Sequence, residues 1–166
     1  MTHSSLAWRD RIVVGMIAFA SVALFYSLFD LLAARGALHT VDLLGRALFK
    51  GLRDPSLLLY PIQPDAAAIL WYSGFHLVVS LVIGLIVTGL VEHAERHPAR
   101  ATRVLLSMSA GFLLTILGVG LMTGPLRGLL PWWSIAAANG LATLLAGLYL
   151  LKRRPGLWGQ LRPAAD

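Results

Sequence analysis

The amino-acid sequence predicts an all-α integral membrane protein with four transmembrane helices and an amphipathic interfacial helix between the first and the second. Of its 166 residues, 57% are hydrophobic and only 13% are charged, whereas charged residues make up about a quarter of an ordinary soluble domain. The mean hydropathy is +0.73. The charged residues leave four long apolar windows, and the eight prolines fall near the ends of these windows or outside them. The chain has no cysteine, which excludes a disulfide scaffold and a thiolate metal site.

The apolar windows predict spans at about residues 12–34, 66–91, 104–126 and 128–151. A hydrocarbon core needs about 20 apolar residues of helix, and lipid offers no hydrogen-bond partner to an open backbone. We therefore expect four helices, with the whole chain (1–166) forming one membrane domain. The first window is expected to be a retained span rather than a cleaved leader, because Arg35 leaves no small-x-small cleavage site before Ala37.

Residues 40–53, between the first two spans, have the pattern of an amphipathic helix. Val41, Leu44 and Leu48 recur on one face. The charged residues of this segment fall on the opposite face: Asp42, Arg46, Lys50 and Arg53. We expect an ion pair between Asp42 and Arg46 at i,i+4, with Thr40 as the N-cap. Two interpretations stay open: the helix lies flat on the membrane with Arg46, Lys50 and Arg53 among lipid headgroups, or these three cations bind a partner subunit.

The distribution of basic residues predicts the orientation. With a cytoplasmic N-terminus, nine lysines and arginines lie inside and five outside, which agrees with the positive-inside rule. The inside set is Arg9, Arg11, Arg96, Arg100, Arg103, Lys152, Arg153, Arg154 and Arg162. We therefore expect both termini in the cytoplasm of a bacterium, with the chain in the inner membrane. The net charge of +6 is explained by this rule and by lipid headgroups, without nucleic acid.

Two ionisable residues other than tyrosine lie well within the predicted spans. Asp30 is near the outer end of the first span, and His76 is deeper in the second. Tyr26 shares a helix face with Asp30, and Tyr72 shares one with His76, so the four side chains are candidates for one cluster. Functional interpretations are a proton or ion relay, a quinone pocket, or one ligand to a haem, with His76 as the cofactor-binding residue. The structural alternative is that Asp30 and His76 only fasten the two helices together.

Other chemical motifs are scarce. His93 and His97 are spaced i,i+4, which allows both to bind one metal ion, but two ligands are too few for a site and no metal is expected. The sequence has no phosphate-binding loop and no nucleophile elbow. We therefore expect no catalytic residue and no enzymatic activity from this chain alone.

Small residues recur four apart in the predicted spans, a spacing that lets membrane helices approach closely. The predicted packing residues are Ser80, Gly84, Ser107, Gly111, Gly120, Gly124, Ala136 and Gly140, together with Asn139 as a polar contact between helices.

Together these features favour a non-catalytic accessory subunit of a larger bacterial membrane complex. A respiratory or other electron-transfer complex is the expected setting, with other membrane subunits and the lipid bilayer as partners. One alternative is a small homo-oligomeric transporter or channel that uses Asp30 and His76. Another is a haem- or quinone-binding redox protein, and either cofactor would then sit at an interface with a partner.

Overall fold

The computed structural model describes residues 3–54, 63–126 and 130–153, and every regular element among them is a helix. Four of these helices are long and apolar enough to cross a membrane, which confirms the predicted all-α class. The elements are α1 (His3–Leu32), α2 (His39–Phe49), α3 (Ala66–Arg96), the 3-10 turn η2 (Pro98–Arg100), α4 (Ala101–Met122), the 3-10 turn η3 (Gly124–Leu126) and α5 (Trp132–Arg153).

The ends of the helices differ from those of the predicted spans, and capping residues and prolines set several of them. Asp65 begins α3 by accepting hydrogen bonds from the backbone N–H groups of Ala67 and Ala68, at 3.1 and 3.2 Å. Pro98 forces the turn that separates α3 from α4. The fourth predicted span began at residue 128, but residues 127–129 lie outside the described part of the chain, and α5 starts after them.

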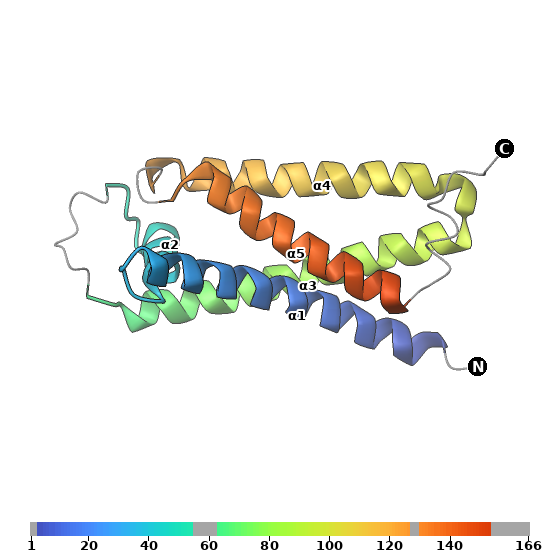
Figure 1. Cartoon of the computed structure of the whole chain (residues 1–166), viewed down its shortest axis with the longest axis horizontal. Coiled ribbons are helices and arrows are strands. Elements are labelled where there is room, and N and C mark those ends of the chain that lie inside the picture. Colours follow the sequence, from blue (N-terminus) through green and yellow to red (C-terminus); the bar gives the residue numbers. More distant parts are fainter. Residues whose placement is uncertain (1–2, 55–62, 127–129, 154–166) are drawn as a thin grey trace.

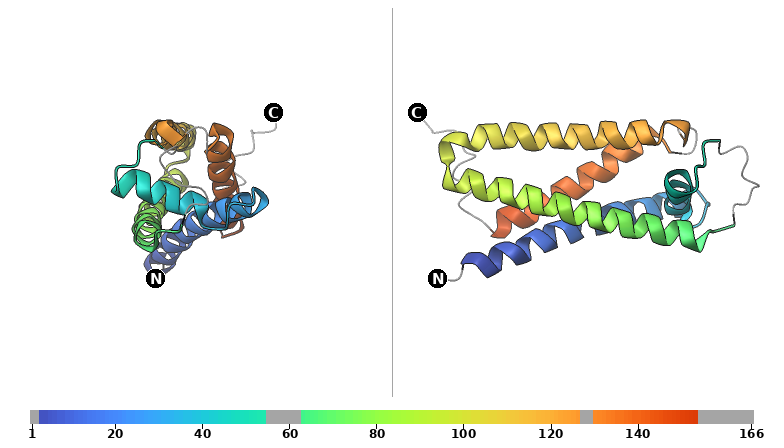
Figure 2. Two further views of the ribbon diagram at one scale, coloured as in Figure 1. Left: turned by 90° about the vertical axis from the view of Figure 1, so that its left-hand side faces the viewer. Right: turned by 180° about the vertical axis from the view of Figure 1, so that it is seen from behind.

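The long helices form an open bundle. α1 and α3 run side by side in opposite directions, and α5 crosses them obliquely after α4 has returned along the other side (Figures 1 and 2). α2 lies across one end of the bundle, which we call the α2 end. At the opposite end α1 begins and α5 finishes, and we call this the terminus end.

α1 and α3 meet at two glycines. A Cβ atom built on Gly84 would lie 2.5 Å from the backbone nitrogen of Gly15, and one built on Gly15 would lie 2.9 Å from the carbonyl oxygen of Ser80. No side chain fits at such distances, so the two backbones are in direct contact. α2 meets α3 in the same way, because a Cβ on Gly45 would lie 2.2 Å from the carbonyl oxygen of Ala68. Glycine at these positions is what permits three helices to pack this closely.

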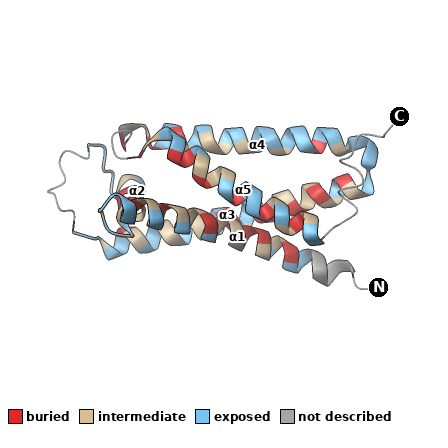
Figure 3. Cartoon of the chain, viewed as in Figure 1, coloured by how far each residue is buried: buried red, intermediate tan, exposed pale blue. Residues whose placement is uncertain are grey.

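α4 packs quite differently. Only Val104 and Gly120, near its two ends, are buried among its 22 residues. Between them the helix is mostly exposed, as Figure 3 shows along its length. Met108 contacts the core at the terminus end, and Gly120 lies against the indole ring of Trp132. Within the described residues, α4 is therefore attached to the rest of the chain mainly near its ends, and most of the surface between them is uncovered.

Candidate functional site

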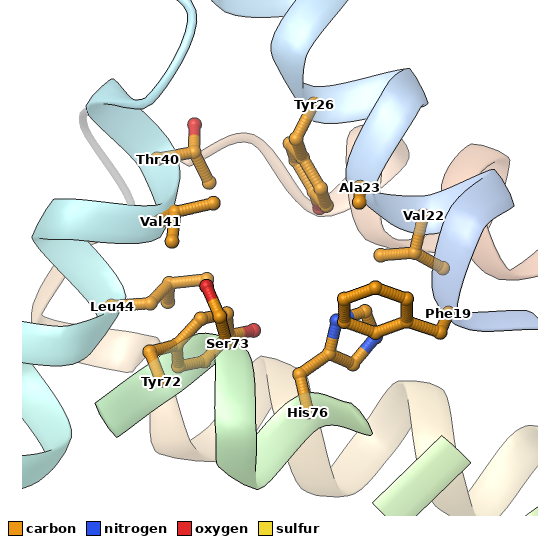
Figure 4. A pocket seen from close by; sticks show the side chains of 10 residues that line it. All are labelled: Phe19, Val22, Ala23, Tyr26, Thr40, Val41, Leu44, Tyr72, Ser73 and His76. Atoms are coloured by element: carbon orange, nitrogen blue, oxygen red, sulfur yellow. The ribbon is translucent and has the colours of Figure 1, made fainter. Parts of the chain in front are cut away.

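A cavity of about 40 Å³ lies where α1, α2 and α3 meet (Figure 4). Its walls combine five apolar and five polar residues: Phe19, Val22, Ala23, Val41 and Leu44, with Tyr26, Thr40, Tyr72, Ser73 and His76. Three of the four residues that the sequence grouped together, Tyr26, Tyr72 and His76, therefore line one space. The fourth, Asp30, does not line it.

His76 is held in the cavity wall by aromatic contacts. The centre of its ring lies 5.1 Å from that of Phe19 on α1 and 6.0 Å from that of Tyr72, one turn earlier on α3. Among the described residues, no hydrogen bond to the imidazole nitrogens is found, so the ring keeps its donor and acceptor for whatever occupies the cavity.

Asp30 does not contact His76 but binds the start of α2. Its carboxylate is fully buried and accepts two hydrogen bonds from Thr40, one from the backbone N–H at 2.6 Å and one from the hydroxyl at 2.7 Å. A carboxylate at a helix N-terminus satisfies an N–H group that has no partner within the helix, and the helix dipole favours its charge. Thr40 was predicted as the N-cap of this helix. That prediction is wrong by two residues, because the N-cap of α2 is Leu38, whose side chain makes no capping hydrogen bond. The carboxylate of Asp30, on α1, accepts the hydrogen bond at the start of α2 instead.

Tyr26 connects the cavity to α5. Its hydroxyl lies 3.4 Å from that of Ser134, which in turn donates to the carbonyl oxygen of Pro131 at 2.7 Å. The phenol is thus engaged in holding α1 against the start of α5.

The size of the cavity limits its chemistry. A space of this volume holds a few water molecules, each of which needs roughly 10–15 Å³ of accessible volume. His76, Tyr72 and Ser73 place polar groups in the wall of this space, while the hydroxyl of Thr40 is directed away from it and donates to Asp30 at 2.7 Å.

The cations predicted to dock a partner are partly paired within the chain. The predicted pair of Asp42 and Arg46 is confirmed at 2.9 Å, and the carboxylate raises the pKa of the guanidinium. Lys50 forms an ion pair with Asp65 and, as the largest cause, lowers the pKa of that carboxyl. The first pair lies within α2, whereas the second joins the end of α2 to the N-cap of α3. Asp42 adds a contact to the same place, because it accepts a hydrogen bond from the backbone N–H of Asp65 at 3.3 Å. Arg53 is exposed after the end of α2.

The terminus end has polar contacts that sequence analysis missed. The buried carboxylate of Asp10 accepts a hydrogen bond from the hydroxyl of Tyr149 at 2.9 Å and lies 3.4 Å from Nε of Arg153, which joins α1 to α5. Arg11 and Glu92 form an ion pair at 2.9 Å between α1 and α3. No spacing pattern in the sequence indicates these contacts, since their partners are more than 80 residues apart.

His93 and His97 lie one helical turn apart at the end of α3, and their rings are stacked with their centres 4.6 Å apart. In the part of the chain that the structure describes, no group of three or more histidine, aspartate or glutamate side chains is placed to hold a metal ion.

The predicted packing residues divide by helix. Ser80 and Gly84 are buried at the α1 crossing, and Gly120 lies against Trp132. The others face little of this chain: Ser107, Gly111 and Ala136 are exposed, and a Cβ on Gly124 or Gly140 would meet nothing within 4 Å. Asn139 donates to the carbonyl oxygen of Ile135 within its own helix, at 2.8 Å.

Comparison with known proteins gives this chain no relative: no family profile, no curated protein and no solved structure matches it.

Proposed function

We propose that the chain is a non-catalytic accessory subunit, which contributes membrane helices to a larger assembly. The observation that carries the proposal is the packing of α4. In the part of the chain that the structure describes, this 22-residue apolar helix fully buries only Val104 and Gly120, and it leaves most of its surface open to other molecules. Its small residues Ser107 and Gly111 lie on that exposed surface, and such residues let a second helix approach closely.

The polar groups of the long helices support the same proposal. Asp30, Tyr26 and Asp10 are each bound to another element of the chain, which accounts for them as structural groups. Polar side chains inside a membrane are costly unless paired, and such pairs fix helices relative to one another.

The setting that we propose is a respiratory or other electron-transfer complex in a bacterial inner membrane, with both termini in the cytoplasm and α2 at the opposite surface. This setting rests on the amino-acid sequence alone. Of the cations first expected to bind a partner there, Arg53 is the best placed, because Arg46 and Lys50 already form ion pairs with carboxylates of the same chain.

Native mass spectrometry of the tagged protein, extracted in mild detergent from its own host, tests the proposal. A heteromeric complex of defined stoichiometry is the expected result, and the identity of the other subunits names the complex. A homo-oligomer or a monomer would contradict the accessory role. Charge reversal at Arg53 should lower the yield of the complex, with Arg9 reversed as the control.

The transporter alternative makes an opposite prediction about the cavity. If Asp30 and His76 carried a solute or a proton, Asp30→Asn and His76→Ala would abolish transport while the protein remained folded. The accessory role predicts that His76→Ala leaves the chemistry of the complex intact, since the ring packs against Phe19 and Tyr72 of its own chain.

A further inference from the structure

The turn between α3 and α4 gathers three arginines at the terminus end of the bundle. Arg96 is the last residue of α3, Arg100 is the last residue of η2, and Arg103 lies in the first turn of α4. All three side chains are exposed. Because η2 contacts both α3 and α4, the three lie around one tight reversal of the chain rather than along a flexible loop.

These arginines differ from the cations at the α2 end. There Arg46 and Lys50 each contact a carboxylate of the same chain. None of the ion pairs in the described ranges involves Arg96, Arg100 or Arg103. Their positive charge is therefore available to a ligand from outside the chain. Arginine binds the oxygens of a phosphate, like those of a carboxylate, through two parallel N–H groups.

The surface next to the arginines is apolar. Leu105 and Leu106, at the start of α4, are 53% and 65% exposed, and the exposed surface continues along the helix. A ligand that covers both surfaces needs an anionic head and a long apolar tail in direct continuity. A phospholipid has this form, and its acyl chains would lie against Leu105 and Leu106 while its phosphate meets the arginines.

We propose that the α3–α4 turn binds an anionic phospholipid, with the head-group phosphate held by Arg96, Arg100 and Arg103 and the acyl chains against the first leucines of α4. The site selects anionic over zwitterionic lipid, because three guanidinium groups without carboxylate partners attract net negative charge. The proposal does not depend on the identity of any partner subunit.

The experiment is native mass spectrometry of the whole chain in detergent, titrated with phosphatidylglycerol or with phosphatidylcholine of the same acyl chains. Phosphatidylglycerol should bind at one saturable site, at least about tenfold more tightly than phosphatidylcholine. The reason is that each basic residue near a membrane surface contributes on the order of a fivefold increase in affinity for an anionic lipid. Equal affinity for the two lipids would overturn the proposal.

Three variants locate the site. Arg96→Gln/Arg100→Gln/Arg103→Gln should lose the preference for phosphatidylglycerol. The charge-matched control Arg9→Gln/Arg53→Gln/Lys152→Gln should keep it, and an equal loss in the control would show that only net charge matters and would overturn the site. Arg96→Lys/Arg100→Lys/Arg103→Lys should retain part of the preference, because the charge remains without the paired donors.

Inorganic phosphate distinguishes the lipid from a free anion. Because the acyl chains contribute to binding, millimolar phosphate should displace little phosphatidylglycerol. Full displacement by phosphate, or a preference of the arginines for a co-purifying acidic protein over the lipid, would contradict the assignment to a phospholipid.

Discussion

The pair formed by α1 and α3 and the single helix α4 have similar compositions but opposite kinds of packing. Both segments are apolar and contain small residues at a spacing of four. In the pair, Gly15 and Gly84 bring the backbones into contact. In α4, a Cβ on Gly111 would meet nothing within 4 Å. The difference teaches that a small-residue pattern identifies a surface for close helix packing, whereas the identity of the partner helix comes from elsewhere.

The largest effect is expected at the glycine crossing. Gly84→Leu places a side chain where the backbone of Gly15 lies, so α1 and α3 must separate, and we expect a loss of about 3 kcal/mol in the free energy of unfolding. Steric trapping in detergent micelles or bicelles measures this change in the free energy of unfolding. Gly111→Leu is the matched control and should leave this stability within about 0.5 kcal/mol. Similar losses in the two variants would remove the distinction between the pair and α4.

A smaller effect is expected where α1 binds α2. Asp30→Ala removes both acceptors of Thr40 and leaves its buried backbone N–H without a partner, at a cost of about 2 kcal/mol. Hydrogen exchange should rise throughout α2 and stay unchanged at the middle of α4. Asp30→Asn retains one acceptor and should fall between the wild type and Asp30→Ala. Unaltered exchange in α2 would mean that the Asp30 contact does not hold this helix.

The smallest effect concerns pH. Burial lowers the pKa of His39, whose Nε2 is buried without a hydrogen-bond partner in the described structure. The unfolded chain therefore takes up the proton first, so stability is complete above the ordinary pKa of about 6.5 and declines as the pH falls through it toward the folded value. Protection of α2 from hydrogen exchange should weaken between pH 7 and pH 5. His39→Gln should remove this dependence, and a dependence that persisted in the variant would assign it to another group.

The helices could be predicted from the sequence because a bilayer requires about 20 apolar residues per span and the charges mark the limits of each window. The neighbourhood of Tyr26, Tyr72 and His76 was also predictable, since residues four apart share a helix face and both faces lie at a similar depth. The partner of Asp30 was not. It depends on how the connection after α1 turns back, with Gly36 at a φ of +86°, so that Thr40 lies beside the end of α1.

The contacts at the terminus end were missed for a related reason. Arg11 and Arg153 were read only as positive charge that sets the orientation, and their partners Glu92 and Asp10 were not considered. Charge counting along the chain predicts the side of a membrane on which a residue lies, but not the residue that faces it across the bundle. The packing of α5, which brings Tyr149 to Asp10, is a tertiary property with no local pattern.

The central claim is that another protein covers α4, and photo-crosslinking in the native host tests it most directly. A benzophenone amino acid at Leu114, which is 67% exposed in the middle of α4, should yield an adduct with one specific membrane protein, identified by mass spectrometry. The same probe at Leu24 of α1, which is 69% exposed, serves as the comparison and should yield much less of that adduct. Adducts at Leu114 only with lipid, or only with a second copy of the chain, would contradict the account.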